Sequence, residues 1–213
     1  MMIASVGFMF GSGGNTLVSL QLGLDEKKKA NEYFSLIVYT LIGIGVILAG
    51  ISFLFAPQIS RLLGASEAMI PYCVLYLRIN MTSAAFFMLQ NLFQNFLITA
   101  EKPRIRFAIT LIAGCTNMLL DWFLVGICGF GIAGAAWATV TSEIVGGTIP
   151  LIYFAVSKSG ILKLVGTRFE AKVILKTCSN GVSAYGVIMY VSFVFLAIYI
   201  GYSMGVAPII GFN

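Results

Sequence analysis

The stretch "NMLLDWFLVGICGFGIAGAAWATVTSE" covers residues 117–143 and joins two long apolar runs through a short, glycine-rich turn. The runs extend beyond it in both directions and predict spans of about 105–126 and 130–157. Apolar runs of this length cross the hydrocarbon core of a bilayer as α-helices, because backbone polar groups there must bond within their own segment. The turn at 127–131 is too short to separate the helices, so the sequence predicts a transmembrane helical hairpin.

The whole chain has the composition of a membrane protein. It contains 213 residues, of which 59% are hydrophobic and 10% charged, whereas a soluble domain is nearer one quarter charged. The predicted fold class is therefore an all-α polytopic membrane protein with about six transmembrane helices. The six predicted spans cover about residues 1–24, 34–57, 70–99, 105–126, 130–157 and 184–206.

The basic residues of the loops predict the orientation of these spans. The five loops carry three, one, three, no and five Lys or Arg residues in chain order, which places the first, third and fifth loops in the cytoplasm. The first span then begins outside at residue 1 without a leader, and we expect that a preceding segment has been lost. The stretch 158–183 has a short amphipathic pattern, which predicts a segment at the cytoplasmic interface or the lead into a helix.

Several classes of function are excluded by residue content. The chain has no histidine, and its four cysteines are isolated without metal-ligand spacing. No nucleophile–base pair can be named, so we expect neither an enzyme nor a bound metal or cofactor. The net charge of +5 comes from short loops that set membrane orientation, so we expect no nucleic-acid partner.

An acid in the middle of a predicted span is the first candidate site. Asp121 lies one helical turn after Asn117 on the same helix face, and Thr139 of the following span reaches roughly the depth of Asn117. A carboxylate, an amide oxygen and a hydroxyl form an oxygen-lined site suited to H⁺ or Na⁺. The alternative is that Asp121 is a hydrogen-bonded packing residue, or stays wet near the outer interface.

Glu143 is a second acid, one turn beyond Thr139 on the same helix face. It lines the same cavity in one interpretation. In the other, it pairs with a basic residue such as Arg78.

The third predicted span carries four amides, which are too many for contact with lipid. One interpretation is hydrogen bonding between helices; the other is a neutral polar wall of a cavity that binds organic cations. The candidate cavity residues are Gln90, Asn91, Gln94 and Glu143. The glycine-rich "FGSGGN" (10–15) lacks the ending of a phosphate loop and predicts close helix packing or a kink.

A weak internal repeat relates "SGGNTLVSLQLG" (12–23) to "SMGVAPIIGFN" (203–213). Repeats of this kind are common in transporters. The loop charges give the two segments opposite directions, so one helix is expected to be missing, and we place the loss at 177–184.

These stretches together resemble the multidrug and toxic compound extrusion (MATE) family of transporters. Residues 11–23, followed by the charged "DEKKKAN", resemble the second helix of that family and its cytoplasmic loop. Residues 117–143 resemble its fifth and sixth helices and are the most specific match, and residues 184–213 resemble its eighth. The polar third span corresponds to its fourth helix.

The resemblance implies a twelve-helix fold of two lobes in the plasma membrane, which is the inner membrane in bacteria. Small organic compounds, often cationic, would leave through a cavity in or between the lobes, driven by inward H⁺ or Na⁺. The cation site of the family matches Asn117, Asp121 and Thr139, and its fourth-helix amides match Asn91 and Gln94. The resemblance implies no cofactor besides the coupling ion, and partners limited to substrates and membrane lipids.

The chain departs from the family pattern in ways that predict an incomplete copy. The first helix, with its acid, and the seventh helix have no counterpart. We therefore expect residues 1–176 to form a partial N-terminal lobe (family helices two to six) and residues 177–213 to be a remnant of the start of the C-terminal lobe. Two alternatives remain: a non-transporting membrane subunit acting through helix–helix contacts, and a lipid flippase of the wider superfamily.

Overall fold

The computed structural model describes residues 2–62, 66–156 and 160–182, and these residues contain helices and connecting segments but no strand. Among these residues, four helices are long and apolar enough to cross a membrane. A bent pair of shorter helices gives a fifth candidate span when the two are counted together. They correspond to the first five predicted spans. The helices are α1 (Met2–Gly23), α2 (Lys27–Leu54), α3 (Ala56–Leu62), α4 (Ile70–Met81), α5 (Ala84–Thr99), α6 (Pro103–Asp121), the π-helix η1 (Trp122–Ile127) and α7 (Gly131–Val156). The predicted sixth span at 184–206 and the repeat at 203–213 lie outside the described residues.

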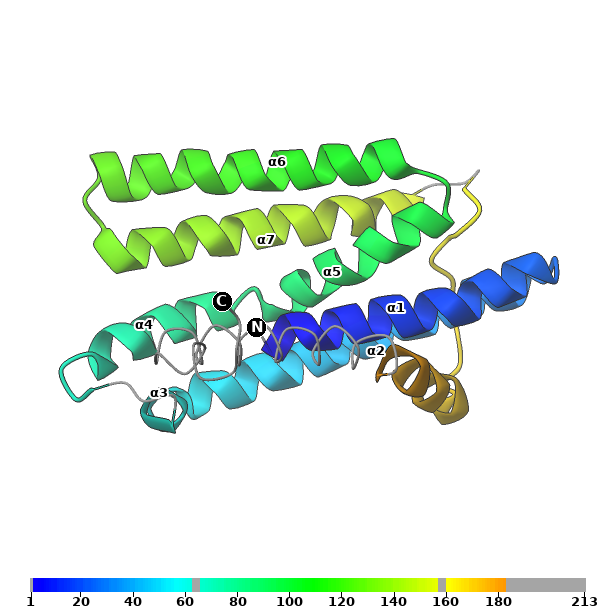
Figure 1. Ribbon diagram of the computed structural model, residues 1–213, viewed down its shortest axis with the longest axis horizontal. Coiled ribbons are helices and arrows are strands. Elements are labelled where there is room, and N and C mark those ends of the chain that lie inside the picture. The colour runs from blue at the N-terminus through cyan, green and yellow to red at the C-terminus, as the bar shows by residue number, and fades with distance from the viewer. Residues whose placement is uncertain (1, 63–65, 157–159, 183–213) are drawn as a thin grey trace, which may run out of the picture.

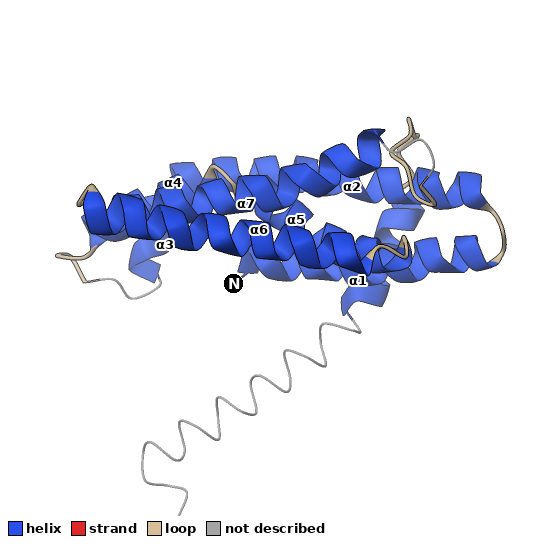
Figure 2. Cartoon of the chain, turned by 90° about the horizontal axis from the view of Figure 1, so that it is seen from above, coloured by secondary structure: helices blue, strands red, loops and turns tan. Residues whose placement is uncertain are grey.

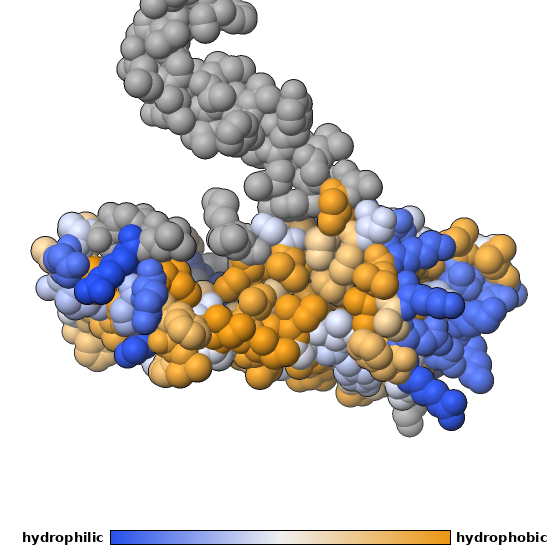
Figure 3. All heavy atoms as spheres, turned by 90° about the horizontal axis from the view of Figure 1, so that it is seen from below, coloured by the Kyte–Doolittle hydropathy of each residue, from blue (hydrophilic) through white to orange (hydrophobic). Residues whose placement is uncertain are grey.

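The long helices run along one common axis (Figures 1 and 2). The α1–α2 and α5–α6 connections lie at one end of the molecule, and the α6–α7 turn lies at the other (Figure 1). Figure 3 shows hydrophobic residues between two hydrophilic ends on one face. This distribution is the one expected for a protein whose middle lies in lipid.

The hairpin predicted at 117–143 is confirmed. Pro103 begins α6 at the first turn, where its missing N–H costs nothing. In the turn that follows η1, Gly129 and Gly131 have φ values of +69° and +53°, which glycine adopts without steric cost. The chain then returns as α7, which lies beside α6 (Figures 1 and 2).

The third predicted span is not one straight helix. It is divided into α4 and α5, which meet at an angle of 55°. Two hydroxyl groups add to the backbone bonds that close the last turn of α4. Thr82 Oγ1 donates to Ile79 O at 2.6 Å, and Ser83 Oγ lies 3.0 Å from Asn80 O; the N–H groups of Thr82 and Ser83 also donate to these two carbonyls. Such side-chain bonds allow a helix to break inside a membrane protein.

Two further features concern the end of the molecule that holds the α1–α2 connection. Helix α2 begins at Lys27, seven residues before the predicted start at 34, because a helix can continue past the apolar part of a span. The connection after α7 lies against the first turns of α2, where the Lys163 N–H donates to Asn31 Oδ1 and the Val165 N–H donates to Ser35 Oγ. Residues 171–182 form a further helix, which agrees with both interpretations of the amphipathic pattern at 158–183.

Glycines allow helix backbones to approach one another closely around α1. A Cβ atom at Gly7 would lie 2.9 Å from Met88 O of α5, and one at Gly11 would lie 2.6 Å from Asn95 Nδ2. On another side of α1, Gly13 contacts the backbone of Thr177 and Gly181 in the 171–182 helix. The close-packing interpretation of the "FGSGGN" segment is thus confirmed.

The core lies around α5. Its side chains Phe93 and Phe96 are fully buried and pack with Phe34 of α2 and Phe154 of α7. The ring centroids of Phe34 lie 4.8 Å from Phe96 and 4.9 Å from Phe154, in edge-to-face geometry. This aromatic cluster joins α2, α5 and α7 and fixes the position of the polar residues on α5.

Candidate functional site

The hairpin sets the relative depth of the predicted cation-site residues. Leu124 of η1 lies against Gly134 of α7, where a Cβ would approach the Leu124 carbonyl to 3.1 Å. Because the two helices are antiparallel, Thr139 lies at about the level of residue 119, between Asn117 and Asp121, within about 3 Å of each along the axis. The structure therefore brings the three residues to one depth, near the end of the molecule that holds the α6–α7 turn.

The three side chains are not bonded to one another in the described part of the chain. Thr139 Oγ1 donates to Ala135 O of its own helix at 3.0 Å. Asn117 and Asp121 are half-buried. Within the described ranges, no group of three His, Cys, Asp or Glu residues is arranged to hold a metal ion.

A π-helix follows Asp121 directly, a feature that the sequence pattern did not reveal. Asp121 is the last residue of α6, and η1 continues from Trp122 to Ile127. π-Helical turns are rare in proteins, and those that occur are often found at functional sites. They have no residue signature, so nothing in this apolar segment would have predicted one.

Glu143 points to the break between α4 and α5. Glu143 Oε2 lies 2.5 Å from Ser83 Oγ, within hydrogen-bond distance, and Ser83 is fully buried. The alternative pairing with Arg78 is not observed, because the Arg78 guanidinium lies over the Phe53 ring, 5.2 Å from its centroid. The salt bridges among the described residues all involve other groups.

The four amides of α5 divide between two neighbours. Asn91 and Asn95 lie on the side of α1, where Asn91 Cβ contacts Gly7 and Asn95 Nδ2 contacts Gly11. Asn91 Nδ2 donates to Phe87 O, and Asn95 Nδ2 donates to Asn91 O, so both amides bond to their own helix. The amides on this side support close packing with α1.

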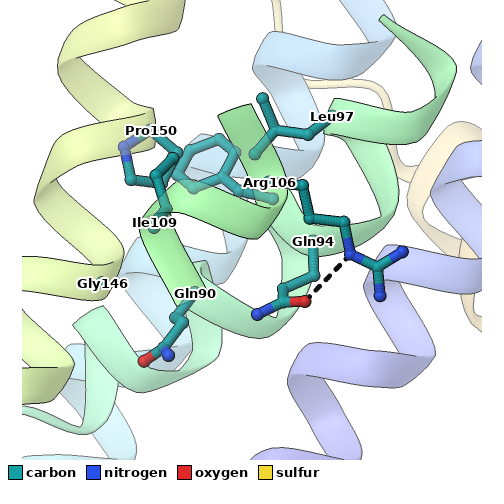
Figure 4. A pocket seen from close by; sticks show the side chains of 8 residues that line it. Gln90, Gln94, Leu97, Arg106, Ile109, Gly146 and Pro150 are labelled. Carbon is teal, nitrogen blue, oxygen red and sulfur yellow. Dashed lines mark hydrogen bonds between the residues drawn. The ribbon is translucent and has the colours of Figure 1, made fainter. Parts of the chain in front are cut away.

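Gln90 and Gln94 lie on the other side, toward α6 and α7 (Figure 4). Arg106 Nε donates to Gln94 Oε1 at 3.1 Å, and Gln94 Nε2 donates to Thr110 Oγ1 at 3.2 Å. Gln90 lies against Gly146 of α7. Gln94 therefore does form hydrogen bonds between helices, as one of the two interpretations of the amides expected.

The space beside these glutamines is of two kinds. A small hollow lined by Gln90, Gln94 and Gly146, among others, has a volume of about 10 Å³, roughly enough for one water molecule. A second hollow of about 360 Å³ is open to the surface and is lined by Gln94, Arg106 and Thr110 together with apolar residues. Only the second is of the size that holds a drug-like molecule.

Comparison with known proteins identifies the family. The family model described as MatE matches residues 1–123. The chain belongs to the MatE family. The multidrug export protein MepA of Staphylococcus haemolyticus is 29% identical over 241 residues, which cover 99% of this chain and 53% of that protein. The match thus spans about half the length of that relative, and the match to the MepA protein of Staphylococcus saprophyticus covers 36% of that protein.

Solved structures agree with this assignment at the level of the fold. A crystal structure of a MATE protein in its bent conformation superimposes with a TM-score of 0.81 at 17% identity, covering 91% of this chain and 44% of that one. An outward-facing MATE transporter superimposes with a TM-score of 0.79 at 16% identity, covering 98% and 51%. The predicted fold class is confirmed: the chain is an all-helical, multi-pass membrane protein with the fold of part of a larger transporter.

Proposed function

We propose that this chain acts in cation-coupled multidrug efflux, exchanging organic compounds for H⁺ or Na⁺ across the bacterial plasma membrane. The observation that carries the proposal is the α6–α7 hairpin, which brings Asn117, Asp121 and Thr139 to one depth beside η1. The relative from S. haemolyticus is a multidrug export protein, which supports the same class of activity. The relatives are transporters rather than enzymes, and no cofactor beyond the coupling ion is part of the proposal.

The proposed mechanism assigns the coupling ion to Asp121. The carboxylate binds H⁺ or Na⁺ with help from the Asn117 amide oxygen and the Thr139 hydroxyl, which releases its bond to Ala135 O. A ligand shifts a conformational equilibrium only by its difference in affinity between the two states. Cation binding must therefore favour the arrangement of α6 and α7 in which these oxygens converge, and drug binding must favour the other.

The proposed substrate surface is formed by the facing sides of α5 and α7. Its polar groups are Gln90 and Gln94 of α5 and Glu143 of α7. The open hollow of about 360 Å³ beside Gln94 lies between α5 and α6, and of these three groups only Gln94 lines it. Asn91 contacts α1 in this structure, so its contribution to the cavity requires α1 to move.

The proposed division of the chain is a partial N-terminal lobe at 1–176 and the start of a second lobe at 177–213. The match to the S. haemolyticus protein runs over 241 residues, whereas this chain has 213. The difference is about the size of one transmembrane helix with a loop, which supports the proposal that a helix is missing; its place near 177–184 rests on the loop charges. Substrates and lipids are the proposed partners.

Efflux of a fluorescent organic cation from a drug-sensitive bacterial strain tests this function. Cells that express the chain should expel the dye when a H⁺ or Na⁺ gradient is present, and Asp121→Asn should abolish this efflux while the chain still inserts. Asp25→Asn is the matched control, because Asp25 lies in the exposed α1–α2 connection. Equal efflux by the Asp121→Asn variant would reject the assigned cation site, and no efflux by the unmodified chain would favour the non-transporting subunit.

A further inference from the structure

Helix α7 contacts the break between α4 and α5 through Glu143 and Gly147. Glu143 Oε2 lies 2.5 Å from Ser83 Oγ, at the break itself. One turn further along α7, a Cβ at Gly147 would lie 2.5 Å from the Phe86 carbonyl oxygen. The carboxyl group is therefore held at the break by close packing of two backbones.

The Ser83 hydroxyl has more acceptors than it has protons. Its Oγ lies 2.5 Å from Glu143 Oε2 and 3.0 Å from Asn80 O, and both partners accept. A serine hydroxyl donates one hydrogen bond and accepts others. Both contacts are hydrogen bonds at the same time only when Glu143 carries a proton and donates it to Ser83 Oγ, leaving the serine proton for Asn80 O.

The neighbouring helices offer Glu143 no charge partner within the described residues. Helices α5 and η1 contain no titratable side chain. Arg78 of α4 lies over Phe53, and Arg106 of α6 donates to Gln94. The remaining titratable residues of α4 and α6, none of which bonds to Glu143, are Tyr72, Cys73, Tyr76, Arg104, Cys115 and Asp121.

We propose that Glu143 and Ser83 form a proton-binding site that controls the break between α4 and α5. With the proton bound, Glu143 donates to Ser83, and Ser83 donates to the Asn80 carbonyl at the end of α4. When Glu143 releases its proton to water, the Ser83 hydroxyl turns and donates its hydrogen bond to the carboxylate. The Asn80 carbonyl then loses the bond from Ser83 Oγ. Proton release thus weakens the cap of α4 at the bend.

This site is separate from the cation site proposed at Asp121 and does not require the chain to transport anything. Glu143 lies one helical turn beyond Thr139, so the two sites are neighbours on α7. The α7 helix is the element that both would move.

Infrared spectroscopy of the full chain in lipid nanodiscs tests proton binding. The unmodified chain should show absorption of a protonated carboxyl group at neutral pH that Glu143→Gln removes and Asp121→Asn retains. Ser83→Ala should move this absorption, because the acceptor of the proton is lost. The same absorption in the unmodified chain and in the Glu143→Gln variant would overturn the proposal, whatever the result of the efflux experiment.

Hydrogen exchange of the backbone at residues 79–87 tests control of the break. After correction for intrinsic exchange, the unmodified chain should exchange about fivefold faster when the site loses its proton, the change expected for one lost hydrogen bond. Glu143→Gln, whose amide donates to Ser83 at every pH, should stay slow throughout. An unmodified chain whose corrected exchange does not change with pH, or a Glu143→Gln variant that changes equally, would contradict the proposal. Circular dichroism confirms that each variant is folded.

Discussion

Gly147 of α7 lies directly against the backbone of Phe86 in α5, so that a methyl group at position 147 would meet the Phe86 carbonyl oxygen at 2.5 Å. A backbone atom cannot move aside as a flexible side chain can. The two helices must therefore separate to admit any larger residue.

We predict that Gly147→Ala destabilises the folded chain by about 1–3 kcal/mol, the usual cost of overpacking. Thermal unfolding of the purified chain in detergent measures this change. Gly114→Ala is the control, because a Cβ there has no neighbour within 4 Å and alanine favours a helix. Equal unfolding temperatures for the two variants would show that α5 and α7 are not in close contact.

The aromatic cluster gives a second prediction. Phe34 is fully buried between Phe96 and Phe154, so Phe34→Ala should cost about 3–5 kcal/mol through the cavity it leaves. Phe107 is 69% exposed on α6, and Phe107→Ala should change stability by much less. Denaturant titration in detergent compares the two, and a larger loss for Phe107→Ala would contradict the position of the core.

The contact between α1 and the 171–182 helix can be tested through a native cysteine, Cys178. Cys178 is half-buried on that helix, and Gly13 meets the backbone of Thr177. Gly13→Val should displace the helix and raise the rate at which maleimide labels Cys178, measured by mass spectrometry of each cysteine. Gly23→Val is the control, since a Cβ at Gly23 has no neighbour within 4 Å, and a labelling rate equal to that of the control would refute the contact.

The orientation can be tested with native cysteines. Cys128 is exposed at the α6–α7 turn, and the loop charges place this turn outside. A membrane-impermeant maleimide should label Cys128 in intact cells and should label Cys178 only after the membrane is opened. The reverse order would show that the positive-inside pattern has been misread.

Much of the fold could be predicted from local signals. The hairpin follows from two apolar runs and a glycine turn, and both Gly129 and Gly131 adopt the positive φ that only glycine adopts freely. The break at Ser83 was not predicted because the sequence around it has no proline or glycine. It depends on side-chain bonds to carbonyls, which a hydropathy pattern does not contain.

The candidate site was only partly accessible to the same reasoning. The shared depth of Asn117 and Thr139 follows from helix rise and a short turn. The contact between Ser83 and Glu143 joins residues 60 positions apart, and no periodicity relates them. The division of the amides had a signal that was missed: Gln90 and Gln94 share one face, and Asn91 and Asn95 share the next one around the helix.

The glycines around α5 come from three different helices: Gly11 of α1, Gly45 of α2 and Gly147 of α7. At each of these contacts the neighbour meets α5 through bare main chain instead of a side chain. The close packing of α5 therefore depends on glycine residues that belong to α1, α2 and α7. A survey of random substitutions should find its most damaging changes at these small residues, which carry no chemistry of their own.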